Sequence, residues 1–184
     1  MKEFRESGLI FRFNDQWEIY RLDKETDYLA KICKQIPGTK SIDFIGYNET
    51  DNLLLFIEVK SFRGYGNRTN MQRLDGKNDD ITIEVAQKVR DSLATIIGSA
   101  RHSTNLPEIW QKYVNHINKN KSLKVIAWVE LDVSIENLLA RAKINMHTRR
   151  NELRKRLTWL TSDVQIMNTK KYDNEITGME VYFE

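Results

Sequence analysis

The sequence contains few of the residues on which several classes of protein depend. A single cysteine, Cys33, excludes an internal disulfide framework and a multi-cysteine zinc site. It lies among Leu29, Ile32 and Ile36, a setting that indicates a buried thiol rather than a nucleophile. Internal repeats, low-complexity segments and recognisable linkers are missing as well. We therefore expect one globular domain built around an apolar core.

Long apolar runs are also missing. No window is apolar enough over enough residues to span a bilayer, and residues 1–8 carry mixed charge without the apolar stretch and cleavage site of a signal peptide. The histidines have neither metal-ligand spacing nor a nearby cysteine, which indicates surface or core positions for His102, His116 and His147. We expect a cytoplasmic protein without a membrane partner.

The charged residues are unevenly distributed along the chain. Of 184 residues, 40% are hydrophobic and 30% charged, and the formal net charge is only +3. However, residues 134–160 hold seven Lys or Arg against two acids, and the segment after Lys60 adds Arg63, Arg68, Arg73 and Lys77. Such segments are compatible with a phosphate-rich partner, although a solvated helix face explains any single run as well.

Hydrophobic periodicity predicts one mixed α/β domain. Strands are predicted at 9–14, 41–48, 53–60, 123–131, 163–168 and 176–183, and helices at 23–36, 80–101, 107–117 and, with a basic face, 134–158. Residues 17–22 fit either a short strand or the start of a helix. Residues 61–79 show no periodicity, and loops of this length are usually functional or disordered. The strands at 41–48 and 53–60 are apolar on both faces, which predicts layers on both sides of the sheet.

Three charged residues stand at one end of the predicted hairpin. If residues 49–52 form its turn, Asp43 faces Glu58 across the two strands, and alternation puts Lys60 on the same face as Glu58. Directly opposed residues have Cβ atoms roughly 4.5–5.5 Å apart, and like charges at that distance destabilise a sheet. Something must therefore compensate the two carboxylates, and a divalent cation would do so.

This arrangement resembles the PD-(D/E)xK nuclease superfamily, which has the restriction-endonuclease-like fold. Its signature is an aspartate at the start of one core strand and Glu/Asp-x-Lys at the end of the neighbouring strand, followed by a helix and another strand. Asp43, Glu58 and Lys60 match that signature, and the resemblance covers about residues 18–131. It implies a single α/β domain with a mixed central sheet flanked by helices, in which residues 132–184 form a C-terminal extension with the basic helix and two strands.

The resemblance also implies a chemistry. Asp43, Glu58 and the backbone carbonyl of Val59 would ligate Mg²⁺ or Mn²⁺, and Lys60 would orient or activate the attacking water, with a pKa lowered by the metal and by burial. The expected function is metal-dependent hydrolysis of phosphodiester bonds in DNA, or in RNA as the second choice, in restriction, repair or phage defence. The residues expected to contact nucleic acid are Arg63, Arg68, Arg149, Arg150 and Arg154.

Several alternatives stay open. A non-catalytic nucleic-acid-binding or interaction module could keep the same fold, and a homodimer is compatible with either function. Glu25, with Glu18 as its competitor, and Gln87 are further candidates for the site, although exposed surface positions explain them as well. Ile42 stands where the family often has proline. An interaction module would use an aromatic surface, although aromatic residues are more often core (Trp110, Tyr113, Trp159 and Tyr172).

Overall fold

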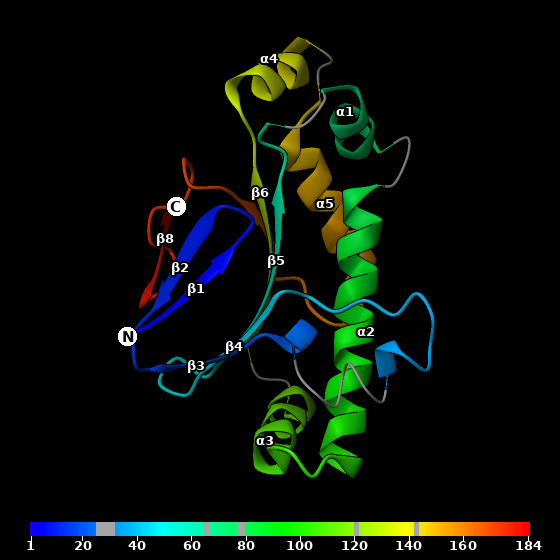
Figure 1. The fold of residues 1–184 in the computed structure, drawn as a ribbon, viewed down its shortest axis with the longest axis vertical. Helices are drawn as coiled ribbons and strands as arrows, with labels where there is room; N and C mark the ends of the chain where they lie inside the picture. Colours follow the sequence, from blue (N-terminus) through cyan, green and yellow to red (C-terminus); the bar gives the residue numbers. More distant parts are fainter. Residues whose placement is uncertain (25–31, 65–66, 77–79, 120–121, 142–143) are drawn as a thin grey trace.

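The fold consists of three layers (Figure 1). The structure is a computed structural model that describes residues 1–184 except 25–31, 65–66, 77–79, 120–121 and 142–143, and except the side chains of 67–69 and 133–135. A five-stranded mixed sheet lies between a layer of helices and a smaller three-stranded sheet. The predicted mixed α/β domain is confirmed, with the difference that helices cover one face of the main sheet and strands the other.

The main sheet combines an antiparallel and a parallel half. Its strands, in spatial order, are β3 (Trp17–Tyr20), β4 (Phe44–Asn48), β5 (Leu53–Ser61), β6 (Ser122–Glu130) and β7 (Val164–Met167). The pairs β3–β4 and β4–β5 are antiparallel, whereas β5–β6 and β6–β7 are parallel. Parallel neighbours need long crossover connections, and the helices between these strands supply them. The segment 17–22, which fitted either a strand or the start of a helix, begins with the edge strand β3.

The small sheet closes the second face of the main sheet. It consists of β2 (Leu9–Phe13) paired with β1 (Lys2–Glu6) and with β8 (Met179–Phe183), all antiparallel. The sequence did not predict β1, because an edge strand exposed on most of its residues has little hydrophobic alternation. Ser7 and Gly8 join β1 to β2, both with positive φ, as a two-residue hairpin requires.

The helices form the third layer. They are η1 (Leu22–Lys24), α1 (Asn67–Asp75), α2 (Ile81–His102), α3 (Pro107–Asn118), α4 (Val133–Arg141) and α5 (Met146–Arg156). The long α2 is capped at its start by Asp80, whose Oδ1 accepts the backbone N–H of Thr82 at 2.8 Å. The predicted apolar stripe of α2, including Val85 and Val89, packs into the core between α2 and the main sheet. None of the helices within the described ranges is long and apolar enough to cross a membrane.

Two predictions of local structure were wrong. Residues 61–79 are not irregular throughout, because α1 forms where Leu74 enters the core, and Gly76 with φ +78° follows its end. The basic helix is not continuous from 134 to 158 but divided into α4 and α5. Asn145 has an extended backbone and its Oδ1 accepts the N–H of His147 at 2.8 Å, so it caps a new helix. Of the predicted helix at 23–36, residues 25–31 lie outside the described residues, and residues 23–24 belong to the short helix η1.

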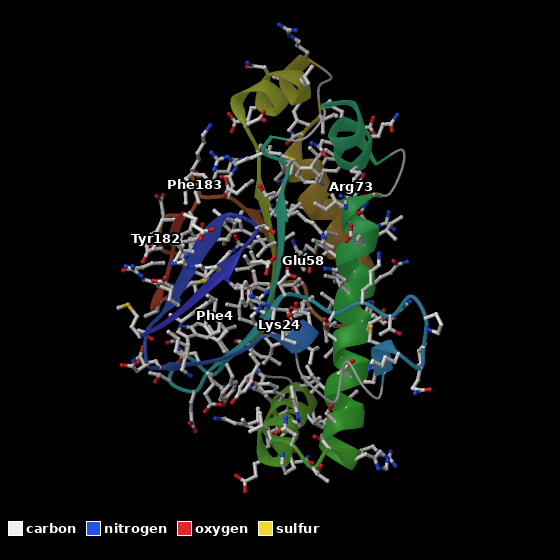
Figure 2. All side chains as sticks on the ribbon, in the orientation of Figure 1. Phe4, Lys24, Glu58, Arg73, Tyr182 and Phe183 are labelled. Carbon is white, nitrogen blue, oxygen red and sulfur yellow. The ribbon has the colours of Figure 1, made fainter. Side chains whose placement is uncertain are left out.

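The main sheet has a hydrophobic core on each of its two faces, as predicted for strands that are apolar on both sides. Along β5, Leu54 and Phe56 face the helices, whereas Leu55 and Ile57 face the small sheet, and all four are buried. The residues after 131 take part in both sheets, since β7 extends the main sheet and β8 the small one. Glu58, near the end of β5, lies close to the middle of the molecule and beside α2 (Figure 2).

Candidate functional site

The observed hairpin register brings Asp43 to the end of β5. Phe44 pairs with Ile57, which is the register that a turn at 49–52 predicts. Asp43 immediately precedes β4, and its Oδ2 accepts the backbone N–H of Val59 at 2.7 Å. The side chain of Asp43 thus bonds the start of β4 to β5 beside Glu58. This position follows from the register that the sequence predicted.

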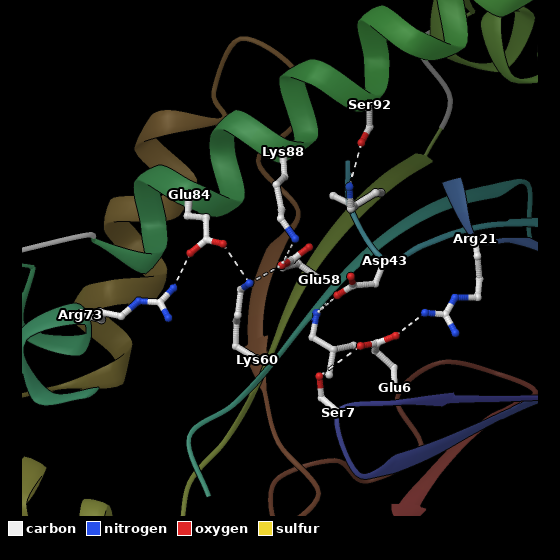
Figure 3. Close-up of polar contacts among 12 residues, drawn as sticks. Glu6, Ser7, Arg21, Asp43, Glu58, Lys60, Arg73, Glu84, Lys88 and Ser92 are labelled. Carbon is white, nitrogen blue, oxygen red and sulfur yellow. Dashed lines mark hydrogen bonds and ion pairs between the residues drawn. The ribbon is translucent and has the colours of Figure 1, made fainter. Parts of the chain in front are cut away.

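Glu58 is the most deeply buried charged residue of this cluster, with 1% of its surface exposed. Its side chain projects toward α2, on the face of β5 that carries Leu54 and Phe56. Its Oε1 lies 2.6 Å from Nζ of Lys88 and 3.0 Å from Nζ of Lys60 (Figure 3). Its Oε2 is buried without a hydrogen-bond partner among the described residues. One carboxylate oxygen of Glu58 is therefore paired with two ammonium groups, and the other has no partner within the described ranges.

The helix α2 contributes two charged residues that the sequence did not single out. Lys88 reaches down to Glu58, and Glu84, one turn earlier, lies with its Oε1 2.9 Å from Nζ of Lys60. Arg73 of α1 pairs with the other oxygen of Glu84. The sequence did contain one sign of these residues, because Glu84 and Lys88 are four positions apart beside the apolar stripe of an amphipathic helix. That spacing could not show which strand the two side chains would contact.

The charge argument made from the sequence needs a correction. Facing carboxylates were expected to require a cation, but the ammonium groups of Lys60 and Lys88 compensate Glu58 directly. Packing of α2 over the sheet supplies this compensation, which strand alternation alone could not predict. Charge balance at Glu58 therefore gives no separate reason for a metal ion.

Asp43 remains the electrostatically costly member of the cluster. Burial, followed by the negative charge of Glu58, raises the pKa of Asp43 to about 7, although Lys88 and the N–H of Val59 act in the opposite direction. Glu6 of β1, which pairs with Arg21, raises the pKa of Asp43 slightly further. Near neutral pH, this carboxyl group can therefore either hold or release a proton.

The net shift of the Lys60 pKa is upward, although burial acts in the expected direction. Burial lowers the pKa of Lys60, but the charges of Glu58 and Glu84 and their hydrogen bonds outweigh burial and raise it. For Glu84, burial raises the pKa, and the nearby cations, with Lys60 first, outweigh it and lower it. Lys60 is thus a firmly protonated ammonium group, suited to hold an anionic oxygen rather than to accept a proton.

The donor set fits a hard cation that keeps water or substrate ligands. Asp43 and Oε2 of Glu58 are oxygen donors, and Mg²⁺ is commonly held by one or two carboxylates together with waters and phosphate oxygens. Across the described ranges, no group of three His, Cys, Asp or Glu residues is arranged to hold a metal ion. The arrangement accordingly does not fit a closed site made of protein side chains alone.

The residues predicted to contact nucleic acid differ in their exposure and in their ion pairs. Arg154 is exposed on α5, and Arg150 is partly buried. Arg63 is exposed, with its guanidinium 4.2 Å from the ring centre of Phe183. Arg149 is only 14% exposed and pairs with acids of its own chain, so its charge is used internally. Arg68 lies in α1 at a position where side chains are not described.

Of the three further candidates for the site, the structure describes Gln87 and Glu18. Glu25 lies outside the described residues, and Gln87 is exposed on α2. Glu18 is in β3 and pairs with Lys112. Ile42 is fully buried and donates its backbone N–H to Oγ of Ser92 at 3.0 Å, a bond that a proline at this position could not make.

The histidines and two of the four aromatic residues lie in the settings predicted for them. His116 is buried, with Nε2 2.8 Å from the backbone oxygen of Ser122, whereas His102 and His147 are exposed. Trp110 and Tyr113 are core residues, as expected. Trp159 and Tyr172 differ, because Trp159 is exposed and Tyr172 is partly buried against Trp128.

Comparisons with known proteins give partial similarities. No family model and no solved structure matches the chain. Over 116 residues it is 32% identical to the Holliday junction branch migration complex subunit RuvA of Ureaplasma parvum serovar 3 and of Ureaplasma urealyticum serovar 10. This match covers 60% of the chain and 57% of each relative. A stretch of 99 residues is 26% identical to the cysteine–tRNA ligase of Neisseria meningitidis, covering 46% of the chain and 14% of the ligase.

Proposed function

We propose that this protein binds DNA. The partial similarity to RuvA, which is named as a subunit of a Holliday junction branch migration complex, supports this function and makes four-way junction DNA the first substrate to test. The consecutive exposed cations Arg154, Lys155 and Arg156 at the end of α5 support it independently. A surface of this kind contacts phosphates and therefore gives binding that weakens with salt.

The salt dependence of binding tests this proposal. Each phosphate contact contributes about 0.9 to the slope of log affinity against log salt concentration. The double variant Arg154→Gln/Lys155→Gln is expected to lower that slope by about 2 on duplex and junction DNA. Lys170→Gln/Lys171→Gln removes the same charge from an exposed loop and is the matched control. Equal slopes for the two double variants would contradict the placement of DNA on α5.

We further propose that the cluster around Glu58 hydrolyses phosphodiester bonds. The observation that supports this second function is the buried, unpartnered Oε2 of Glu58 beside Asp43, with the ammonium group of Lys60 next to the same carboxylate. Asp43 and Glu58 would hold Mg²⁺ or Mn²⁺. When bound, such an ion polarises a phosphoryl oxygen and lowers the pKa of its bound water.

The residues of the chain have separate roles in this reaction. Lys60, kept protonated by Glu58 and Glu84, would hold a non-bridging phosphate oxygen and so orient the phosphodiester. Lys88 would keep the Oε1 side of Glu58 fixed while Oε2 stays available. Because the pKa of Asp43 is about 7, binding of a cation there would release a proton below neutral pH. Activity is therefore expected to rise as the pH passes through about 7.

A cleavage assay separates the two proposals. Supercoiled plasmid and four-way junction DNA are incubated with wild type, Asp43→Asn and Lys60→Met in Mg²⁺ or Mn²⁺, with the exposed Glu180→Gln as control. The two site variants are expected to lose cleavage by more than a hundredfold while their DNA affinity in EDTA stays unchanged. Wild type that binds DNA but cuts no faster than Lys60→Met in either metal would refute hydrolysis and leave DNA binding intact.

A further inference from the structure

The helix α2 has an apolar groove on the side away from the Glu58 cluster. Glu84 and Lys88 of α2 face the main sheet, whereas their sequence neighbours Ile83 and Gln87 line this groove. The groove has a volume of about 560 Å³ and is lined by Ile83, Ala86, Gln87, Arg90, Arg156 and Trp159. The two sites thus share one helix but none of the side chains that form them.

Trp159 differs from the other tryptophans of the chain. It is 59% exposed, whereas Trp17, Trp110 and Trp128 are each at most 1% exposed. Each of those three donates its indole N–H to an oxygen atom at 2.8 to 3.0 Å, whereas the indole N–H of Trp159 has no hydrogen-bond partner within the described part of the chain. An exposed indole beside Ile83, which is itself 41% exposed, presents a flat apolar face to solvent.

The charged side chains that line the groove are cations. Its lining contains two arginines and no acid, and the exposed Lys155 adjoins Arg156 on α5. Arg90 pairs with Asp91, and Arg156 contacts Thr82 and, at 3.5 Å, Asp80. A guanidinium has five N–H donors, so both arginines keep donors for a ligand. The groove combines an aromatic face with cations, a combination that suits a base and its phosphates.

We propose that this groove binds single-stranded nucleic acid, with one unpaired base stacked on Trp159 and the flanking phosphates on Arg90 and Arg156. The inference rests on the proposed DNA binding and specifies it, because it selects unpaired nucleotides over continuous duplex. Charge favours this occupant over a second copy of the chain. Two copies meeting through this face would bring Arg90 and Arg156 against their own equivalents, whereas a nucleic-acid strand carries the complementary charge.

Intrinsic fluorescence and affinity measurements with a labelled thymidine oligonucleotide test this assignment. Because the other tryptophans are buried, stacking on Trp159 is expected to quench the exposed component of the emission. Trp159→Ala is expected to abolish that quenching and to weaken single-strand binding by about 5- to 150-fold, the range equivalent to about 1–3 kcal/mol for a stacked base. Trp159→Phe is expected to retain most of the affinity. Ile36→Ala, at a residue 58% exposed, is the control for loss of an exposed apolar side chain.

Two matched arginine variants test the proposed phosphate contact of Arg90. Arg90→Gln is expected to weaken single-strand binding several-fold, and Arg5→Gln to leave it unchanged. Both guanidinium side chains are 65% exposed and both take part in surface ion pairs, but Arg5 lies in β1 on the opposite layer. Equal affinities for the two variants would overturn the role of Arg90.

The outcomes distinguish this inference from the function on which it rests. Wild type that binds duplex or junction DNA, with Trp159→Ala binding single strands equally well, overturns the groove assignment and leaves DNA binding standing. Wild type that binds no DNA at low salt overturns both. A dimer in sedimentation that Trp159→Ala dissociates without any change in DNA affinity would assign the groove to self-association and refute the proposal.

Discussion

Replacing Asp43 by asparagine should stabilise the protein while abolishing its proposed chemistry. The pKa of this carboxyl group is about 7 in the fold, against an ordinary value of 3.8 for an unfolded chain. Asparagine keeps an oxygen that can accept the N–H of Val59 but has no charge to bury next to Glu58. The substitution therefore removes the cost of an ionised carboxylate without removing the bond between β4 and β5.

The magnitude follows from the difference between these two pKa values. Between pH 4 and 7 the folded state binds the proton of Asp43 more tightly than the unfolded state, so the stability of wild type falls as the pH rises and levels off above about 7. At about 1.4 kcal/mol for each tenfold change in proton affinity, the full cost is about 4 kcal/mol. Asp43→Asn should thus exceed wild type by less than about 1 kcal/mol at pH 4 and by up to about 4 kcal/mol at pH 8.

Urea unfolding between pH 4 and pH 8 measures this difference, with the exposed Asp173→Asn as the control variant. A gain that does not depend on pH, or an Asp43→Asn protein less stable than wild type at pH 8, would refute the assignment of the pH dependence to Asp43. Added Mg²⁺ should raise the melting temperature of wild type more at pH 8 than at pH 6, because the ion competes with the proton. The same ion should have little effect on Asp43→Asn.

Three further substitutions test the surrounding structure. Lys88→Met should destabilise the fold by about 1.5–3 kcal/mol in urea unfolding, because Glu58 loses one of its two charged partners and keeps Lys60, and Glu58→Gln in the same chain should restore much of that loss. Gly46→Ala should lower the melting temperature, because its Cβ would lie 2.8 Å from Cδ1 of Ile19; an unchanged melting temperature would mean that Ile19 yields freely. Asp80→Ala should cost about 1–2 kcal/mol through loss of the α2 cap, and helicity by circular dichroism should decrease at the same time.

Local patterns predicted the parts of the fold that depend on neighbouring residues. The helix at 80–101 and the hairpin were predictable because an apolar stripe, a capping acid and a tight turn are all short-range features. The break between α4 and α5 was missed because the basic, weakly periodic segment gave no apolar stripe to follow, so Asn145 alone marked the new start. The helix α1 was missed because Leu74 became a core residue only through contacts with distant segments.

Local sequence was enough to predict that Asp43, Glu58 and Lys60 meet at one end of a hairpin. Strand alternation and the length of the turn set that register, and both act over a few residues. The residues that surround these three come from long-range packing. Packing of α2 across the sheet brought Lys88 to Glu58 and Glu84 to Lys60, raising rather than lowering the pKa of that lysine. Such contacts join residues far apart in the chain, and no local pattern encodes which helix face will meet which strand.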